Sequence, residues 1–183
     1  RARAAAWALG VCNGCQLMAL LGWVPRGADS ETLAEERQPR FVHNASGRFE
    51  SRYLGVKILE SPAVLLKGMQ GSSLGVWVAH GEGRAHFPDA AVLDEALDKG
   101  LAPLRYVDDA GEVSAEYPHC PNGSAEAIAG MCSDDGRHLA MMPHPERAFL
   151  KWQCPWAPKE WAKHDAAPWI RLFQNARTFC EGE

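Results

Sequence analysis

Apolar and polar residues are arranged along the chain in a pattern typical of an α/β protein. A short apolar run, residues 4–9, precedes the glycine-rich segment 10–16, and the apolar stretch 17–21 follows it. A short apolar run bounded by turn residues is consistent with a buried strand, and a longer stretch after a tight turn with a helix. The first part of the chain is therefore predicted to fold as a strand, a sharp turn and a helix.

Further strands are predicted where short apolar runs recur between turn residues. These runs cover residues 41–42, 55–59, 76–80, 104–108, 127–132 and 139–142. Residues 28–40 between them are polar and predict an irregular segment or a short helix.

Two longer segments show helical periodicity. Residues 89–100 predict a helix with Asp89 as the N-cap and Gly100 as the C-cap. Its apolar face comprises Val92, Leu93, Ala96 and Leu97. Residues 168–180 predict a second helix whose apolar side would pack on a sheet. That side comprises Trp169, Leu172, Phe173, Ala176 and Phe179.

This mixture predicts a single three-layer α/β domain over residues 1–183, with its site at the carboxyl ends of strands. The composition, 46% hydrophobic and 23% charged, suits one domain with a sizeable core. The net charge of −4 gives no support for nucleic-acid binding through a basic patch. No apolar run approaches the roughly 20 residues of a membrane span. Six scattered cysteines fit a reducing compartment, so a cytoplasmic location is expected.

The glycine-rich segment places a thiol where covalent chemistry is favoured. Cys12 lies midway between Gly10 and Gly14, whereas Cys15 is not centred. A reactive residue on a sharp strand-to-helix turn is a nucleophile elbow, and its neighbours two positions away must be small. The helix N-terminus favours a thiolate at Cys12, and the backbone N–H of Asn13 would be free to bind an oxyanion.

Two other interpretations of this segment stay open on the motif alone. Cys12 and Cys15 could be small buried residues of a glycine-rich turn. They could also form a C-x-x-C redox or metal pair. A zinc site would require a second pair at similar spacing, and the remaining cysteines are scattered. Those are Cys120, Cys132, Cys154 and Cys180.

A histidine and a carboxylate lie far downstream, in a proline-rich segment. Pro143 and Pro145 favour an extended backbone, so His144 and Glu146 would project to the same side. The carboxylate would then orient the imidazole and stabilise its cation. A surface His–Glu pair in a loop is the alternative. Together with Cys12, the pair provides the thiol, base and acid that covalent catalysis by cysteine requires.

At this point a family resemblance is evident, and it spans nearly the whole chain. The chain resembles the glutaminase domain of the large, single-chain phosphoribosylformylglycinamidine synthases of purine biosynthesis. The segments that carry the resemblance are residues 10–16, 20–23, 44–52, 79–83, 121–124, 128–130, 136–138, 142–147 and 168–177. The elbow alone indicates a class I glutamine amidotransferase, and the segments R-F-E-S-R, H-G-E-G and P-N-G-S are more specific.

The resemblance implies a fold and a reaction. The fold would be the three-layer, flavodoxin-like class I amidotransferase fold. Cys12 would attack the side-chain amide of L-glutamine, with His144 as general base and acid and Glu146 as its orienting partner. Water would hydrolyse the glutamyl thioester. The ammonia would pass to an ATP-dependent synthetase domain of the same longer polypeptide, which would use ATP and Mg²⁺. The glutaminase domain itself would need no cofactor and no metal.

Further matching residues suggest a pocket for the ends of glutamine. Arg48 could meet the α-carboxylate and Glu82 the α-ammonium, with His80 beside it. Gln16 lies one helical turn beyond Cys12 and could touch the substrate or brace the turn. Binding these groups in a buried pocket requires such charge and hydrogen-bond partners.

The resemblance also implies that the domain is incomplete at its N-terminus. Only nine residues precede Gly10, whereas the family's domain begins upstream with strands and a glycine-rich loop that supplies a second oxyanion donor. Loss of one such donor costs roughly 10²–10³ in rate. This chain alone is therefore expected to hydrolyse glutamine poorly. Cys120, where the family usually has asparagine, is a second departure.

Two other functions remain as alternatives. The chain could be another Cys-His-Glu enzyme, either a different amidotransferase or a peptidase-like hydrolase. Such a peptidase would not need charge partners for both ends of an amino acid. The chain could also be a non-catalytic remnant that contacts a synthetase, although the intact set Cys12, His144 and Glu146 argues against this.

Overall fold

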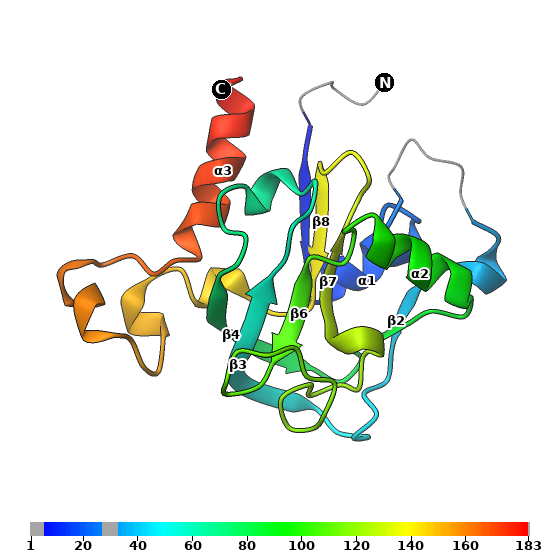
Figure 1. Ribbon diagram of the computed structural model, residues 1–183, viewed down its shortest axis with the longest axis horizontal. Coiled ribbons are helices and arrows are strands. Elements are labelled where there is room, and N and C mark those ends of the chain that lie inside the picture. Colours follow the sequence, from blue (N-terminus) through cyan, green and yellow to red (C-terminus); the bar gives the residue numbers. More distant parts are fainter. Residues whose placement is uncertain (1–5, 27–32, 183) are drawn as a thin grey trace.

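The computed structural model of the chain describes residues 6–26 and 33–182 (Figure 1). The start of the predicted first strand and part of the polar segment 28–40 lie outside the described residues. The strands are β1 (Ala8–Val11), β2 (Arg40–Val42), β3 (Glu50–Ile58), β4 (Ser73–His80), β5 (Arg84–His86), β6 (Leu104–Val107), β7 (Ile128–Cys132) and β8 (His138–Met141). The α-helices are α1 (Asn13–Leu20), α2 (Ala90–Asp98) and α3 (Ile170–Glu181). Short 3-10 helices cover Glu35–Arg37, Val64–Leu66, Ala125–Ala127, Pro145–Arg147, Lys151–Gln153 and Lys159–Lys163.

Six strands form one mixed sheet in the order β1-β8-β7-β6-β3-β4, and β2 pairs with β5 in a small second sheet. Within the six-stranded sheet, β1 and β8 are parallel and the other pairs are antiparallel. Parallel pairing needs a crossover of a dozen or more residues, whereas residues 133–137 join β7 directly to β8. The α/β class is confirmed, but this sheet has more antiparallel pairing than a flavodoxin-like fold would have.

The strand directions bring distant segments to one edge of the sheet. Because β1 is parallel to β8 and the ladder from β8 to β4 is antiparallel at every step, β1, β8, β6 and β4 all run the same way. Their carboxyl ends therefore lie at the same edge. Cys12 follows β1, His80 ends β4, and His144 follows β8 by three residues. The expected placement of the site at the carboxyl ends of strands agrees with this topology.

Helices cover both sides of the sheet. Helices α1 and α2 lie on one side and α3 on the other (Figure 1). Alternate residues of β8 separate the two sides, with Leu139 and Met141 in the cluster that includes Trp169 and Leu172, and Ala140 in the cluster with α1. The alternation follows from the two-residue period of a strand.

Both predicted amphipathic helices are present. The Asp89 side chain accepts a hydrogen bond from the N–H of Ala91 (2.9 Å) and caps α2, and Gly100 adopts φ 66° just beyond it. In α3, Asn175 is buried on the apolar side and donates to the carbonyls of Leu65 and Lys67, each at 2.9 Å. Periodicity did not predict this polar anchor.

Two strands differ from the prediction. β3 begins at Glu50, five residues earlier than predicted, and β5 was not predicted at all. Residues 50–52 are polar, so hydrophobicity alone gives no strand signal there. Their backbone is nevertheless paired with β4, from Glu50 opposite His80 onward. Tertiary pairing decides these strands more than local composition does.

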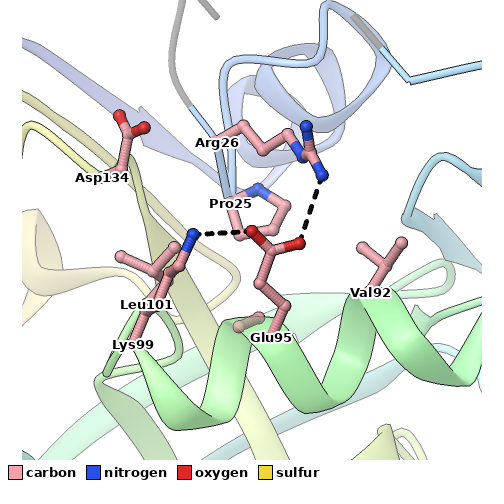
Figure 2. A pocket seen from close by; sticks show the side chains of 8 residues that line it. Pro25, Arg26, Val92, Glu95, Lys99, Leu101 and Asp134 are labelled. Atoms are coloured by element: carbon pink, nitrogen blue, oxygen red, sulfur yellow. Dashed lines mark hydrogen bonds and ion pairs between the residues drawn. The ribbon is translucent and has the colours of Figure 1, made fainter. Parts of the chain in front are cut away.

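An ion-pair cluster ties α2 to the segment after α1. Figure 2 shows Glu95 between Arg26, at 3.1 Å, and Lys99, at 2.6 Å. The hydrogen bond from Lys99 and the charge of Arg26 lower the pKa of Glu95. The pocket beside it has a volume of about 100 Å³, which is small for a ligand. The cluster therefore has a structural role in packing α2 onto the domain.

The two glycines that flank Cys12 are not equivalent. A Cβ on Gly10 would lie 2.6 Å from the carbonyl oxygen of Gly14 and 2.8 Å from the sulfur of Met18. A Cβ on Gly14 would meet nothing within 4 Å apart from its chain neighbours and its own helix backbone. The expectation that both neighbours of the turn must be small is right for Gly10 and wrong for Gly14 in this structure.

This difference predicts opposite effects of two alanine substitutions. Gly10→Ala forces β1 away from α1 and should lower the free energy of unfolding by about 1–3 kcal/mol. Gly14→Ala introduces no clash and reduces backbone freedom in the unfolded chain, so it should leave stability unchanged or raise it by roughly 0.5–1 kcal/mol. Urea unfolding of both variants measures the difference. Equal losses of stability would contradict the packing described at Gly10.

Candidate active site

Cys12 occupies a strained turn between β1 and α1. Its backbone has φ 53° and ψ −107°, a conformation that non-glycine residues rarely adopt. The N–H of Cys12 donates to the carbonyl of Met141 at 2.9 Å, and its own carbonyl accepts the N–H of Cys15 at 3.0 Å. Strain of this kind costs of order 1–3 kcal/mol and persists only where the surroundings enforce it. Here β8 and the first turn of α1 hold Cys12 in place.

The outer edge of β4 contacts both the thiol and the histidine. β4 is the last strand of the sheet order, so one side of its backbone has no partner strand. The N–H of His144 donates to the carbonyl of Trp77 at 2.8 Å, and Sγ of Cys12 lies 3.6 Å from the carbonyl oxygen of Ala79. Residues two apart on a strand are separated by about 7 Å. One strand edge therefore sets the spacing of the two segments.

His144 and Glu146 form the predicted pair, but not on the extended segment expected from the prolines, because Pro145–Arg147 forms a 3-10 helix that begins directly after His144. Nδ1 of His144 lies 2.6 Å from Oε1 of Glu146. Burial raises the pKa of Glu146, but the hydrogen bond with His144 and the charges of His144 and Arg147 outweigh it, and the net pKa is lowered. The ionised carboxylate accepts the proton of Nδ1. Nε2 of His144 is buried and has no hydrogen-bond partner among the described residues.

Asn13 and Gln16 connect the turn to the loop after β4. The Asn13 side chain donates to Oε1 of Gln16 at 2.9 Å, and Nε2 of Gln16 donates to the carbonyl of Glu82 at 2.8 Å. Gln16 thus braces the turn against this loop. The N–H of Asn13 stands at the first position of α1, where helix geometry provides no intrahelical acceptor.

His80 is a buried, neutral histidine beside the site. It is 3% exposed, and its ring packs against the backbone of Gly83 so closely that a Cβ there would lie 2.6 Å from Nδ1. Burial lowers the pKa of His80 to about 4, and the charges of His144 and Arg52 act in the same direction. Neither ring nitrogen has a hydrogen-bond partner among the described residues.

The two charged residues predicted to bind glutamine lie farther out. The Glu82 carboxylate is half exposed and lies 3.4 Å from Nε2 of His43. Arg48 is exposed and lines a pocket of about 390 Å³ together with Tyr117 and Cys120. The structure thus brings Cys12, His144, Glu146, Gln16 and His80 to one edge of the sheet. It places the side chains of Arg48 and Glu82 at the surface.

Two buried asparagines that sequence reasoning left without a role hold the loop after β4. The side chain of Asn44 donates to the carbonyls of Arg48 and His80 and accepts from the N–H of Gly83, at 2.8–2.9 Å. Asn122 donates to the carbonyl of Gly83 at 2.7 Å. Both lie in segments that carry the family resemblance, and this is the sequence feature that could have marked them as part of the site.

A buried ion pair begins β3. Glu50 is 3% exposed and pairs with Arg52, whose guanidinium also reaches the phenol oxygen of Tyr117 at 3.0 Å. Glu50 lies opposite His80 in the ladder. The pair therefore links the neighbourhood of His80 to the loop that carries Tyr117. Both residues lie in the R-F-E-S-R segment of the family resemblance, but the sequence did not predict that they pair with each other.

The six cysteines are all free, but they differ in exposure. Cys12 is half-buried, whereas Cys15 is fully buried. Burial, together with the charge of Cys12, raises the pKa of Cys15 well above its ordinary value.

Within residues 6–26 and 33–182, no group of three or more His, Cys, Asp or Glu residues is arranged to hold a metal ion. No helix in the described part of the chain is long and apolar enough to cross a membrane.

The chain matches a known family over almost its whole length. The family model described as "CobB/CobQ-like glutamine amidotransferase domain" matches residues 1–180. Among solved structures, PurLQS from Thermotoga maritima superposes with a TM-score of 0.60 at 22% identity, over 93% of this chain and 60% of that one. At this identity the superposition shows a shared fold.

Curated relatives are phosphoribosylformylglycinamidine synthases. The Arabidopsis thaliana protein, named as a probable synthase of chloroplasts or mitochondria, is 60% identical over 96% of this chain. The Dictyostelium discoideum and human proteins are 55% and 46% identical over 96% and 98% of it. The chain spans only 12–14% of the length of these relatives. The plant relative is named for an organelle, so the cytoplasmic location expected for this chain remains a prediction.

The buried His80 predicts a specific dependence of stability on pH. Its pKa is about 4 in the folded chain against an ordinary value of 6.5. Between pH 6.5 and about pH 4 the unfolded chain therefore binds more protons than the folded chain does. Stability is therefore lost as the pH falls through this window. The loss from this group between pH 7 and pH 5 is about 2 kcal/mol.

Replacement by a residue that does not titrate isolates this effect. Urea unfolding of the chain and of His80→Gln at both pH values should show a smaller loss for the variant. An equal loss in both proteins would mean that His80 is not buried in its neutral form.

Proposed function

The chain belongs to the CobB/CobQ-like glutamine amidotransferase family, and on this premise we propose that it is the glutaminase part of a phosphoribosylformylglycinamidine synthase. It would release ammonia from L-glutamine and deliver it to the synthetase part of a longer polypeptide. That part would convert formylglycinamide ribonucleotide to the amidine in purine biosynthesis. The identity of 46–60% to synthases from a plant, an amoeba and human supports this assignment.

The observation that carries the proposal is the strained Cys12 at the strand-to-helix turn. A nucleophile elbow carries its central residue in a strained conformation on a sharp turn, and φ 53° at Cys12 supports this assignment. Sγ would attack the amide carbon of glutamine and form a tetrahedral intermediate. The N–H of Asn13, at the first position of α1, would stabilise its oxyanion.

His144 would move the proton between the two halves of the reaction. Its unpartnered Nε2 would accept the thiol proton of Cys12 and then donate it to the departing ammonia. Glu146 would hold Nδ1 and stabilise the imidazolium. Water, activated by the same Nε2, would then hydrolyse the glutamyl thioester and release glutamate.

The surroundings suggest how glutamine would be held. Gln16 and the neutral His80 would form the polar wall beside Cys12. Arg48 and Glu82 lie nearer the surface, where they would meet the α-carboxylate and α-ammonium at the rim of the site. No step of this glutaminase reaction needs a cofactor or a metal. ATP and Mg²⁺ would serve the synthetase part.

An electrophilic glutamine analogue, such as a diazoketone derivative of glutamine, tests the nucleophile without requiring turnover. We expect it to label Cys12, and excess glutamine to block the labelling, as peptide mass spectrometry would show. His144→Asn should slow the labelling by about 10²-fold, because it removes the general base. Cys154→Ala, which alters another half-buried thiol, should label as the unmodified chain does.

Different outcomes separate the candidate functions. Labelling that glutamine does not block would favour a different Cys-His-Glu enzyme over a glutaminase. Labelling of Cys12 and Cys154 at equal rates, unaffected by His144→Asn, would contradict an assembled site and favour a non-catalytic domain.

A further inference from the structure

Cys15 is a second thiol at the candidate site for which the glutaminase chemistry has no use. It lies in the first turn of α1, three residues after Cys12, and its side chain is 0% exposed. It packs in the cluster that also contains Met18 and Ala19, with Cys12 against the edge of the same cluster. A small apolar residue would fill this position equally well, so packing alone does not account for a thiol there.

The backbone brings the two cysteines within disulfide range. The N–H of Cys15 donates to the carbonyl of Cys12 at 3.0 Å, which closes a tight turn from residue 12 to residue 15. The Cα atoms at the two ends of such a turn lie less than about 7 Å apart. Disulfides join Cα atoms that are about 4.4–6.8 Å apart, so the backbone separation permits a bond here.

The two thiols differ in their exposure to solvent, and this difference sets the order in which an oxidant would meet them. Cys12 is half-buried at the start of α1, where its thiol is partly open to solvent. Cys15 is fully buried in the cluster that Cys12 borders, so it is protected from solvent oxidants. An oxidant from solution would therefore meet Cys12 first. The buried thiol would be positioned to react only with an oxidised Cys12.

We propose that Cys12 and Cys15 form a reversible disulfide when Cys12 is oxidised by a peroxide, and that this bond protects the nucleophile and switches the site off. In the first step Sγ of Cys12 attacks a peroxide oxygen and the O–O bond breaks. For hydrogen peroxide the products are the sulfenic acid and water. In the second step Sγ of Cys15 attacks the sulfenic sulfur, the S–O bond breaks, and the hydroxyl leaves with the Cys15 proton as water.

The consequence follows from the chemistry of cysteine oxidation. A sulfenic acid without a neighbouring thiol proceeds to the sulfinic acid, which thiols do not reduce. A disulfide with Cys15 intercepts this path, and a dithiol reductant restores both thiols. The loss of glutamine hydrolysis on oxidation rests on the proposed function. The formation of the disulfide is independent of that function.

Cys120 is the competing thiol near the site. Like Cys12 and Cys15, it adds to the effect of burial in raising the pKa of the Tyr106 phenol. Its Sγ lies 3.5 Å from Oδ1 of Asn122, inside the network that holds the loop after β4. No turn of the backbone joins it to Cys12. Cys120→Ala is therefore a matched control: it removes a buried thiol near Tyr106 but should leave the disulfide intact.

The experiment exposes the chain to a small excess of hydrogen peroxide and maps the cysteines by mass spectrometry without reduction. We expect a peptide containing Cys12 and Cys15 that has lost both thiol hydrogens. Alkylation of Cys12 should be lost after peroxide and restored by dithiothreitol. Cys120→Ala should behave in the same way. In Cys15→Ala, Cys12 should accumulate as sulfinic or sulfonic acid, and its alkylation should not return.

Cys15→Ser keeps the side chain close to its native size, in case the alanine variant does not fold, and should lose reversibility as Cys15→Ala does. A disulfide from Cys12 to Cys120, or full recovery of Cys12 in both Cys15 variants, would overturn the proposal. Labelling by the glutamine analogue before peroxide treatment reports on the proposed function separately. Reversible disulfide formation without that labelling would support the redox pair and contradict the glutaminase.

Discussion

The outward carbonyl groups of the edge strand β4 organise the site. The carbonyls of Gly75, Trp77 and Ala79 follow one another at intervals of two residues along the edge that has no partner strand. They contact, in turn, the indole N–H of Trp169, the backbone N–H of His144 and the thiol of Cys12. An exposed strand edge is normally a liability, and here groups from three distant segments cover it. The same contacts hold the segments that carry the thiol and the imidazole two residues apart along one strand edge.

Three polar side chains hold the loop after β4 next to the turn at Cys12. Gln16 reaches across to the carbonyl of Glu82, while Asn44 and Asn122 hold Gly83 from two sides. These side chains satisfy backbone groups of a loop that could not otherwise be buried without cost. The loop, the turn at Cys12 and the ring of His80 are therefore mutually positioned. A rigid surrounding of this kind is what keeps a strained residue in its reactive conformation.

Much of this arrangement could be predicted from the sequence because its causes are local. The turn at Cys12 follows from an apolar run, Gly10 and a helical stretch. The two-residue spacing brings His144 and Glu146 together, although on the 3-10 helix Pro145–Arg147 and not on the extended segment predicted. The rest depends on tertiary pairing. Nothing in the polar residues 50–52 predicts a strand, since β4 supplies their partners. Likewise, the open space beside Gly14 and the exposed positions of Arg48 and Glu82 became evident only from the assembled structure.

The proposed function requires that Glu146 hold His144 with Nδ1 protonated and that the unpartnered Nε2 reach the Cys12 thiol. Ring nitrogen NMR of His144, in the chain and in Cys12→Ala, tests it most directly. The account predicts a proton on Nδ1, strongly deshielded by the 2.6 Å contact with Glu146, and a bare Nε2 whose chemical shift changes when the thiol is removed. A proton on Nε2, or a His144 ring that does not respond to Cys12→Ala, would contradict it.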